Sequence, residues 1–513
     1  MGLFSFLTKT PVKDLPLLRF YNTLSGKTEG FEPFFGPSAV PGLRARRTVK
    51  MYNCGPTVYD EQHLGNMFAA ILPDTLRRVL EVWGYKVKQI INITDFGHLS
   101  GDNEGDPDQG EDKMSRGLKR EGLEPTLKNM RAMAEKYAAM YIKDISLLGV
   151  ATDKISFPRA SDYIGEQVAL IRTLEQKGYA YTTSDGVYFN TAKFPSYGKL
   201  GNINLVGQRE GSRVEENREK KNPHDFALWK FSKKLGWESP WGLGFPGWHI
   251  ECTAMIFKLL GKQIDIHTGG IEHIPIHHNN EIAQAEAATG RQYVRYWLHN
   301  EHITVEGKKI SKSLGNTVYL RQIVDRGYST RAFRYWVLTG HYRTPMNFTW
   351  EALAGADQAL KRLTRHFLEA RLEAEDARPS DERNATRLAA VSESEGRASS
   401  ASFLVAFYEA VGNDLNTAQA LALVWENIKT LDKKTLRDVD HVLGLGFSDP
   451  QAASRLNVIA ENDLPAEVQK LTVERETART AKDFAKADEL RGQVENLGYT
   501  IKDTDDGPKL SKK

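Results

Sequence analysis

The spacing of hydrophobic positions predicts a parallel sheet near the start of the chain. Residues 47–54 alternate like a strand, residues 66–83 repeat apolar positions with the period of a helix, and residues 86–94 read as a second strand. Gly84 directly follows the helical pattern and is expected to end it. A strand, a helix and a strand in this order are typical of parallel strands joined by a crossover helix, so the pattern predicts an α/β core.

Helical spacing returns in the middle of the chain and, beyond about residue 350, is expected to continue to its end. We interpret residues 120–245 as an insertion between two halves of a nucleotide-binding sheet, with a short strand at 186–189. The acidic, Gly-rich stretch 100–112 is expected to be a solvated loop, and the polar stretches 207–222 and 375–400 to be loosely packed. The segments with helical spacing are 120–147, 161–178, 355–373, 399–432 and 484–497.

Composition narrows the class of protein. A chain of 513 residues predicts several domains, and 40% hydrophobic with 26% charged residues is ordinary for a globular enzyme. No apolar run reaches the length of a membrane span, and the first residues lack the apolar core and cleavage site of a signal peptide. The net charge of +3 does not itself indicate nucleic-acid binding, so any basic binding surface must be local.

Candidate metal ligands gather in residues 247–284. This stretch holds Cys252, one of two cysteines in the chain, and Pro275, a residue that favours the start of a helix. If a helix begins just after Pro275, His277 and Glu281 lie one turn apart on the same face. A thiolate, an imidazole and a carboxylate together suit Zn²⁺ better than Mg²⁺ or Ca²⁺.

The second cysteine decides how many ligands such a site could have. If Cys54 reaches the same place, a set of four ligands is complete, whereas His278 has Ile282 one turn later and gains no carboxylate partner. Two other interpretations stay open from the residues alone. A lone cysteine is often a small buried apolar side chain, and a Cys54–Cys252 disulfide is conceivable, although two cysteines without a secretory leader indicate a reducing compartment.

Two further segments suit phosphate chemistry. Gly65 closely follows His63 at the start of the predicted helix, where a side chain is absent and the helix N-terminus favours phosphate. Residues 309–316 carry two lysines and two serines, which suit a transient polyphosphate because ammonium groups stabilise developing negative charge. Each segment alone also fits a plain capped loop or a solvated basic turn.

Together these motifs resemble one family, the cysteinyl-tRNA synthetases of class I, over about residues 18–510. The motifs fall in the order of the family, and they depart from its commonest form at Asn66, where the class has a second histidine, and at Ile310, where it has methionine. The matching segments begin Tyr21-Asn-Thr-Leu, Cys54-Gly-Pro-Thr-Val-Tyr, His63-Leu-Gly-Asn, Asp225-Phe-Ala-Leu-Trp, Gly247-Trp-His-Ile-Glu-Cys, His277-His278, Glu281-Ile-Ala-Gln, Lys309-Ile-Ser-Lys-Ser, Arg343-Thr-Pro-Met-Asn-Phe and Ala481-Lys-Asp-Phe-Ala.

The resemblance implies an α/β protein with a Rossmann-type parallel-sheet catalytic core, an inserted connective domain and a C-terminal all-α bundle. The expected units are an N-terminal extension 1–17, a first core half 18–119, a connective domain 120–245, a second core half 246–320, a linking unit 321–370 and a helical anticodon-binding domain 371–513.

The resemblance also implies the reaction and its residues. ATP with Mg²⁺ would activate L-cysteine to cysteinyl-adenylate, which is transferred to the 3′ end of cysteine tRNA by a cytoplasmic monomer with one Zn²⁺ and no membrane partner. Trp248 would close over the bound amino acid. The implied catalytic residues are His63, Asn66, Lys309 and Lys312; the ATP contacts are Thr57, His63, Gly65, Asn66, Gly269, Gly270, Lys309 and Lys312; the cysteine contacts are Cys54, Gly55, Thr57, Trp248 and His277; and the zinc ligands are Cys54, Cys252, His277 and Glu281.

Three alternative functions stay open. A ligase that joins cysteine to an amino sugar would share the adenylation core, but the long stretch that follows the core here favours tRNA. A non-catalytic paralogue that binds RNA or zinc is expected to lose residues of the two signatures, yet His63, Lys309 and Lys312 are present. A purely structural zinc protein would need a closed metal site.

Overall fold

The computed structural model of the protein describes residues 15–34, 48–96, 113–203, 218–311, 315–370, 400–449, 464–504 and 507–512. Outside these residues lie Lys312, the acidic stretch 100–112, most of the N-terminal extension and most of the polar stretches 207–222 and 375–400.

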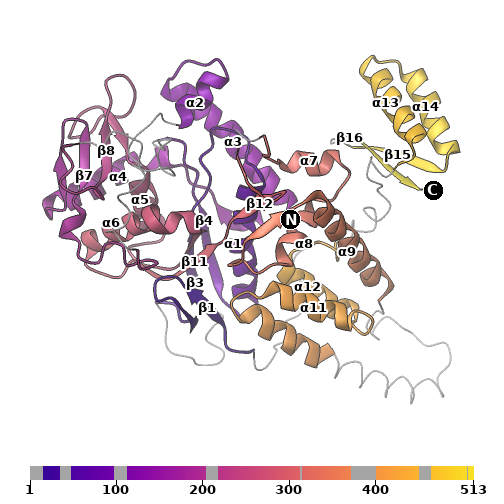
Figure 1. Cartoon of the computed structure of the whole chain (residues 1–513), viewed down its shortest axis with the longest axis horizontal. Coiled ribbons are helices and arrows are strands. Elements are labelled where there is room, and N and C mark those ends of the chain that lie inside the picture. Colours follow the sequence, from indigo (N-terminus) through magenta and orange to yellow (C-terminus); the bar gives the residue numbers. More distant parts are fainter. Residues whose placement is uncertain are drawn as a thin grey trace, which may run out of the picture.

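A five-stranded sheet forms the centre of the molecule (Figure 1). Its strand order is β11-β10-β3-β4-β5, and every neighbouring pair is parallel. The predicted strand–helix–strand unit is confirmed, because β3 and β4 pair in register from Thr48 opposite Lys86 to Asn53 opposite Ile91. The strands are β3 (Thr48–Asn53), β4 (Lys86–Ile91), β5 (Ile155–Ser156), β10 (Ile264–Gly270) and β11 (Val294–Asn300).

Helices cover both faces of this sheet, as is usual for parallel strands. Successive residues of a strand point to opposite faces, so Met51 packs in the cluster that contains α1 (Leu64–Val82), and Tyr52 packs with α5 (Trp248–Leu259) and α6 (Asn279–Thr289). The near-continuous apolar character of the strands therefore reflects burial on two sides.

An antiparallel sheet of four strands, with order β6-β7-β8-β9, lies beside the central sheet. The predicted strand at 186–189 is its β7, and α4 shares an apolar cluster with it and with α5 and α6. The elements here and in the connection before them are α2 (Lys113–Arg120), α3 (Leu127–Leu147), η3 (Thr152–Lys154), η4 (Ala160–Tyr163), α4 (Ile164–Gln176), β6 (Ala180–Thr182), β7 (Gly186–Phe189), η5 (Thr191–Lys193), β8 (Phe226–Phe231) and β9 (Gly244–Pro246).

A small three-stranded sheet follows β11 and leads into helices. Its order is β13-β12-β14, with β12 antiparallel to β13 and parallel to β14. Strands β12 and β13 form a hairpin. The elements are β12 (Ile303–Val305), β13 (Lys308–Lys309), α7 (Leu320–Asp325), α8 (Thr330–Leu338), β14 (Met346–Phe348) and α9 (Trp350–Glu369), and near the start of the chain β1 (Arg19–Asn22) pairs antiparallel with β2 (Lys27–Gly30).

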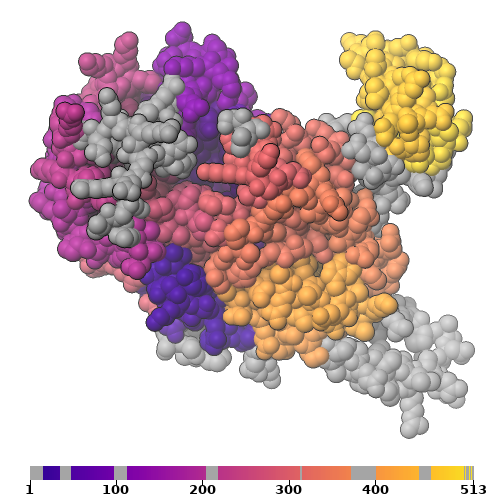
Figure 2. All heavy atoms as spheres, in the orientation of Figure 1, coloured from indigo at the N-terminus to yellow at the C-terminus, as the bar shows by residue number. Residues whose placement is uncertain are grey.

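The described residues after 370 form two parts, of which the first shares the main hydrophobic core and the second has its own. The helical residues 400–412, together with α11 (Thr417–Asn427) and α12 (Lys433–Leu443), belong to the same core as α1, α8 and α9. Residues 464–512 bury their own cluster and stand as a lobe apart from the other described residues (Figure 2). This lobe comprises α13 (Ala466–Thr480), α14 (Phe484–Asn496), β15 (Tyr499–Thr504) and β16 (Gly507–Lys512).

The structure differs from the expected all-helical end in two places. The helical pattern 399–432 is interrupted at residues 413–416, and the chain closes with an antiparallel hairpin of β15 and β16. No helix in the described ranges is both long and apolar enough to cross a membrane.

A buried charge cluster fastens α1 to the helices that follow the core. The carboxylate of Asp74 lies 2.7 Å from nitrogens of both Arg78 and Arg334. Arg78 also donates to the carbonyl of His441 at 2.8 Å, and Arg334 donates to that of Leu443 at 2.6 Å. Burial opposes ionisation of Asp74, yet the arginines hold the pKa of this carboxyl well below its usual range. Removing one partner of such a buried pair typically costs about 3–5 kcal/mol, so α1 is firmly attached to α8 and α12.

Candidate functional site

The predicted site residues gather at the carboxyl ends of β3 and β10. Strands β4 and β5 lie on one side of β3, and β10 and β11 lie on the other, so the strand order changes direction between β3 and β10. In open parallel sheets ligands bind in the crevice at this position. Cys54 follows β3 directly, and the segment with His277 and Glu281 follows β10.

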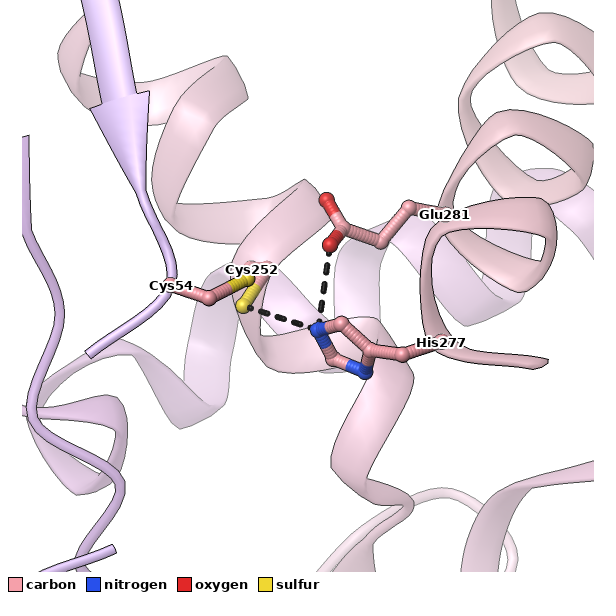
Figure 3. Close-up of side chains that lie close together, drawn as sticks. All are labelled: Cys54, Cys252, His277 and Glu281. Carbon is pink, nitrogen blue, oxygen red and sulfur yellow. Dashed lines mark hydrogen bonds and ion pairs between the residues drawn. The ribbon is translucent and has the colours of Figure 1, made fainter. Parts of the chain in front are cut away.

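Four of the predicted ligands converge (Figure 3). The sulfur atoms of Cys54 and Cys252, a ring nitrogen of His277 and a carboxylate oxygen of Glu281 all lie within 4.8 Å of one another. Cys252 Sγ is 3.6 Å from His277 Nε2, and His277 Nε2 is 3.1 Å from Glu281 Oε1. Both cysteines are free thiols, so the disulfide that the sequence left open is not formed.

These distances fit a tetrahedral metal ion. Bond lengths of about 2.3 Å to sulfur and about 2.0–2.1 Å to nitrogen or oxygen place the ligand atoms around a tetrahedral zinc roughly 3.3–3.8 Å apart. In addition, Glu281 Oε1 is buried, and the ring nitrogen that lies 3.1 Å from it is Nε2 of His277, itself a candidate ligand. A buried carboxylate needs a cationic or hydrogen-bonding partner, and a metal ion held by both residues would supply one. The chemistry of the four side chains therefore fits a zinc ion.

The expectation that His278 lacks a partner was wrong. Residues Ile274–His278 form a π-helical turn before α6, and His277 and His278 lie four and three residues before Glu281, so both face the site. His278 Nε2 lies 3.2 Å from Cys54 Sγ and 4.0 Å from Glu281 Oε1. Cys54, His267, His278 and Glu281 consequently form a second set of four whose ligand atoms also lie within 4.8 Å of one another. The two sets share Cys54 and Glu281.

Shared protons balance the charges of the cluster. A hydrogen bond from the Cys54 thiol lowers the pKa of Cys252 to about 6, while burial raises the pKa of Cys54. Burial acts to lower the pKa of His277, but Cys252 and Glu281 outweigh it and raise this pKa to about 10. Burial likewise opposes ionisation of Glu281, yet His267 and His277 bring its pKa to about 2. Because metal ligands must be deprotonated, a metal ion would displace the proton on His277.

A layer of histidines behind the ligands was not predicted from the sequence. His249 Nδ1 is 2.9 Å from His277 Nδ1, His299 Nε2 is 2.7 Å from His278 Nδ1, and His267 Nε2 is 3.1 Å from Glu281 Oε2. Partners of this kind fix the orientation of metal ligands. The available signal was density, because seven of the 13 histidines lie in residues 247–302.

Trp248, the first residue of α5, borders the cluster. Its half-buried indole stacks on the ring of His277, with centroids 4.2 Å apart and an angle of 29° between the planes. Gly269 and Gly270 end β10 beside the same histidines, and a Cβ at Gly269 would lie 2.7 Å from His278. A side chain cannot be accommodated there without displacing a candidate ligand.

The predicted nucleotide residues lie at the start of α1. His63 is the N-cap residue, and its Nδ1 accepts from Gly65 N at 3.1 Å. Asn66 Oδ1 accepts from His63 N at 3.2 Å, which completes a capping box. A Cβ at Gly65 would lie 2.8 Å from His63 Cε1, so only glycine permits this ring position. The two signature residues thus shape the helix N-terminus as a pair.

The segment that carries Lys309 lies against this helix N-terminus. It contains β13 (Lys308–Lys309), which we call the lysine strand. The position of a Cβ at Gly65 is 3.5 Å from Ile310 Cδ1, and Leu64 N donates to Val318 O at 2.9 Å. Lys309 is exposed at the end of β13, and Asn316 closes the loop by donating to Lys309 O at 3.0 Å. Lys312 lies outside the described residues.

The loop after β3 completes the site. Gly55 N donates to Asn92 Oδ1 at 2.8 Å, and a Cβ at Gly55 would lie 1.7 Å from Asn92 O, so the backbone approaches β4 closely. Thr57 forms a parallel bridge with Thr94. Cys54, Gly55 and Thr57 are therefore fixed relative to the end of β4.

Comparison with solved structures identifies the fold. It is similar to that of Mycobacterium tuberculosis methionyl-tRNA synthetase in complex with methionyl-adenylate, with a TM-score of 0.54 at 13% identity, over 82% of this chain and 95% of that chain. The sequence model of the family described as "tRNA synthetases class I (C) catalytic domain" matches residues 42–358. The protein is thus an aminoacyl-tRNA ligase with a class I catalytic domain.

Relatives of similar length narrow the class further. The chain is 40% identical to "Cysteine--tRNA ligase 1" of Burkholderia lata over 96% of both chains, and 40% identical to "Cysteine--tRNA ligase" of Thermus thermophilus over 96% of this chain and 98% of that one. A second family model, "Cysteinyl-tRNA ligase anticodon binding domain", matches residues 461–508. The chain belongs to the cysteine–tRNA ligase family.

Proposed function

We propose that one Zn²⁺ bound by Cys54, Cys252, His277 and Glu281 selects L-cysteine in this ligase. The observation that carries the proposal is the convergence of two thiols, an imidazole and a carboxylate at the carboxyl end of the parallel sheet. The set with two sulfur ligands is favoured over the set with His267 and His278 because thiolates are the preferred ligands of zinc.

Selection of cysteine follows from the chemistry of the metal. A zinc ion held by these residues would supply a Lewis acid that favours the thiolate form of the substrate sulfur, whereas the alkoxide of serine is too basic to form at neutral pH. The protein shapes the site around this contact, and we assign Trp248 as the side chain that packs against the bound cysteine. A difference in metal bonding can separate two substrates of nearly equal size, which burial alone does poorly.

The chain's own residues act by position and charge. The cysteine carboxylate attacks the α-phosphorus of ATP, forming the adenylate and releasing pyrophosphate, and the terminal ribose hydroxyl of cysteine tRNA then attacks the adenylate carbonyl. Neither step requires a protein nucleophile. We assign the nucleotide to His63, Gly65 and Asn66 at the N-terminus of α1, and the leaving pyrophosphate, with Mg²⁺, to Lys309 and Lys312. Thr57, Gly269 and Gly270 complete the proposed ATP contacts, and Gly55 the proposed cysteine contacts.

We propose that the enzyme is a cytoplasmic monomer and that the two parts of its helical end have different functions. Residues 464–512 would bind the anticodon region of cysteine tRNA, a proposal supported by the family match at 461–508 and by the separate core of this lobe. Residues 400–449 would instead support the catalytic core, with which they share apolar packing. The proposed anticodon-binding unit, residues 464–512, is therefore smaller than the unit 371–513 expected from the sequence. A ligase that acts on an amino sugar would have no use for the terminal lobe.

The two neighbouring histidines provide a matched test of the zinc set. His277→Gln is expected to remove zinc from the purified protein, whereas His278→Gln is expected to leave about one zinc per chain, because only His277 belongs to the set with both thiols. Metal analysis of the two variants after gel filtration measures this directly. Loss of zinc from His278→Gln with retention in His277→Gln would assign the metal to the second set.

The lysine strand is tested without altering the metal site. Lys309→Ala is expected to slow cysteine-dependent ATP–pyrophosphate exchange by about 10- to 100-fold, since its charge is needed mainly as pyrophosphate develops. Zinc content and the KM for cysteine should stay near those of the wild type. An unchanged exchange rate would show that β13 is an ordinary exposed turn of the surface.

A further inference from the structure

Two consecutive residues between the helix at 400–412 and α11 hold an unusual backbone conformation. Asp414 and Leu415 have φ values of 57° and 54°, and they are the only consecutive non-glycine residues with positive φ in the described part of the chain. Each such residue costs roughly 1–2 kcal/mol, and a leucine lacks the short polar side chain that eases the conformation. Neighbouring contacts must therefore hold this turn in place.

The carboxylate of Asp414 supplies those contacts. It is 4% exposed, and its Oδ1 accepts from Tyr21 N at 2.8 Å and from the Tyr342 hydroxyl at 2.6 Å. Its Oδ2 accepts from Arg343 Nε at 2.8 Å and Nη2 at 2.7 Å, and His341 Nε2 lies 3.6 Å away. Both oxygens are thus bound to segments far away in the sequence.

The loop that contains Tyr342 and Arg343 leads directly to the lysine strand. Residue 346 begins β14, which pairs with β12, and β12 pairs with the strand of Lys309. Asn347 Oδ1 accepts from Gly307 N at 2.7 Å and from Thr304 Oγ1 at 2.9 Å, so β14 also fixes the turn between β12 and β13. A shift of the loop at 341–343 is consequently carried to Lys309 through a short, hydrogen-bonded sheet.

Apolar packing near the turn leaves space. Leu415, Thr417, Gly340 and Tyr342 border a partly open cavity of about 30 Å³ between α1, α8 and α11. Close packing normally fixes the position of a segment. Because a small space remains here, the loop at 341–343 depends on its polar contacts, which are the bonds of Asp414 and the hydrogen bond from Glu301 N to Tyr342 O at 2.8 Å.

We propose that Asp414, in the helical part 400–449, is a positioning residue for adenylation that sets the placement of Lys309 through Arg343 and β14. The inference rests on the proposed role of Lys309 toward pyrophosphate. It assigns to residues 400–449 a contribution to the first step of the reaction, in addition to their packing against the core.

The test removes the negative charge of Asp414 and keeps a side chain of nearly the same shape. Asn tolerates positive φ about as well as Asp and can still accept from Tyr21 and Tyr342, so Asp414→Asn removes the ion pair with Arg343 and the longer contact with His341. We expect kcat of pyrophosphate exchange to fall about tenfold, with zinc content unchanged and the KM for cysteine within about twofold, because displacing a catalytic group by a fraction of an ångström costs rate. Arg343→Gln should give the same loss, and the double variant should be no slower than either single variant.

A matched control separates this role from a loss of stability. Asp440 is a second buried aspartate of the same helical part, and its carboxylate accepts from Gly446 N at 2.7 Å and Ser448 N at 2.8 Å, within its own segment. Asp440→Asn is expected to lower the melting temperature without changing kcat. The inference is overturned if Asp414→Asn and Arg343→Gln exchange at the wild-type rate, or if Asp440→Asn slows exchange equally. Lys309→Ala, measured in the same assay, distinguishes the two failures. If its exchange rate is also unchanged, the proposed role of the lysine strand fails. If Lys309→Ala alone exchanges slowly, only the role of Asp414 fails.

Discussion

The Cys252→Ser enzyme is expected to lose at least about 1,000-fold in kcat/KM for cysteine, which is about 4 kcal/mol of transition-state stabilisation, while its affinity for ATP stays near the wild type. Changing a partner of a metal ligand typically costs 10- to 100-fold in affinity or activity, and Cys252 is proposed as a ligand itself. A serine hydroxyl is a poor zinc ligand at neutral pH, so the site should lose its metal. Metal analysis and cysteine-dependent pyrophosphate exchange measure the two effects.

The chelated wild type is the control for this variant. Removing zinc with a chelator should abolish exchange, and adding zinc back should restore it, whereas zinc should not restore Cys252→Ser. Thr253→Ser provides a neighbouring substitution on α5 that keeps the hydroxyl bound to Gln284 Oε1 at 2.9 Å, and it should retain both zinc and activity. Purified wild-type protein that is active and contains no zinc would contradict the assignment.

Local patterns predicted those parts of the fold and site in which neighbours in sequence are also neighbours in space. The period of apolar residues gave α1 between β3 and β4, and the four-residue spacing of His277 and Glu281 was enough to place them together at 3.1 Å. Cys54 could be joined to them only by the family resemblance, because its approach depends on the pairing of β3 with β10.

The missed features depend on a spacing that was not considered or on distant contacts. His278 lies three residues before Glu281, and residues at this spacing also share a helix face, so the test of the four-residue spacing alone missed it. Asp414 reaches Tyr21 and Arg343 across 393 and 71 residues, a contact that no local period encodes. In the hairpin of β15 and β16, the buried apolar side chains among the described residues are Tyr499, Ile501 and Leu510, so the alternation covers too few positions to indicate a strand.

The structure changes which C-terminal truncation is expected to stay folded. If residues 371–513 formed a separate anticodon-binding domain, as expected from the sequence, their deletion would leave the adenylation site folded. The structure instead joins residues 400–449 to the core: Trp83 of the core packs edge-to-face on Tyr408 at 6.0 Å, and the cluster at Asp74 bonds to carbonyls of α12. A protein that ends at residue 370 would leave Trp83, Arg78 and Arg334 without these partners, and it should fail to fold stably.

A protein that ends at residue 449 is therefore the informative truncation. It retains the shared core and both ends of the Asp74 cluster, and it removes the lobe 464–512 with its separate apolar cluster. We expect its cysteine-dependent pyrophosphate exchange to stay within about twofold of the full-length enzyme. Transfer to tRNA at limiting tRNA should fall by at least about 100-fold, with a shallower dependence on salt, because lysine and arginine contacts to phosphate are lost. Raising the tRNA concentration should recover part of the rate, which a damaged active site would not allow. A folded 1–449 protein that charges limiting tRNA at the full-length rate would refute the anticodon-binding role of the lobe.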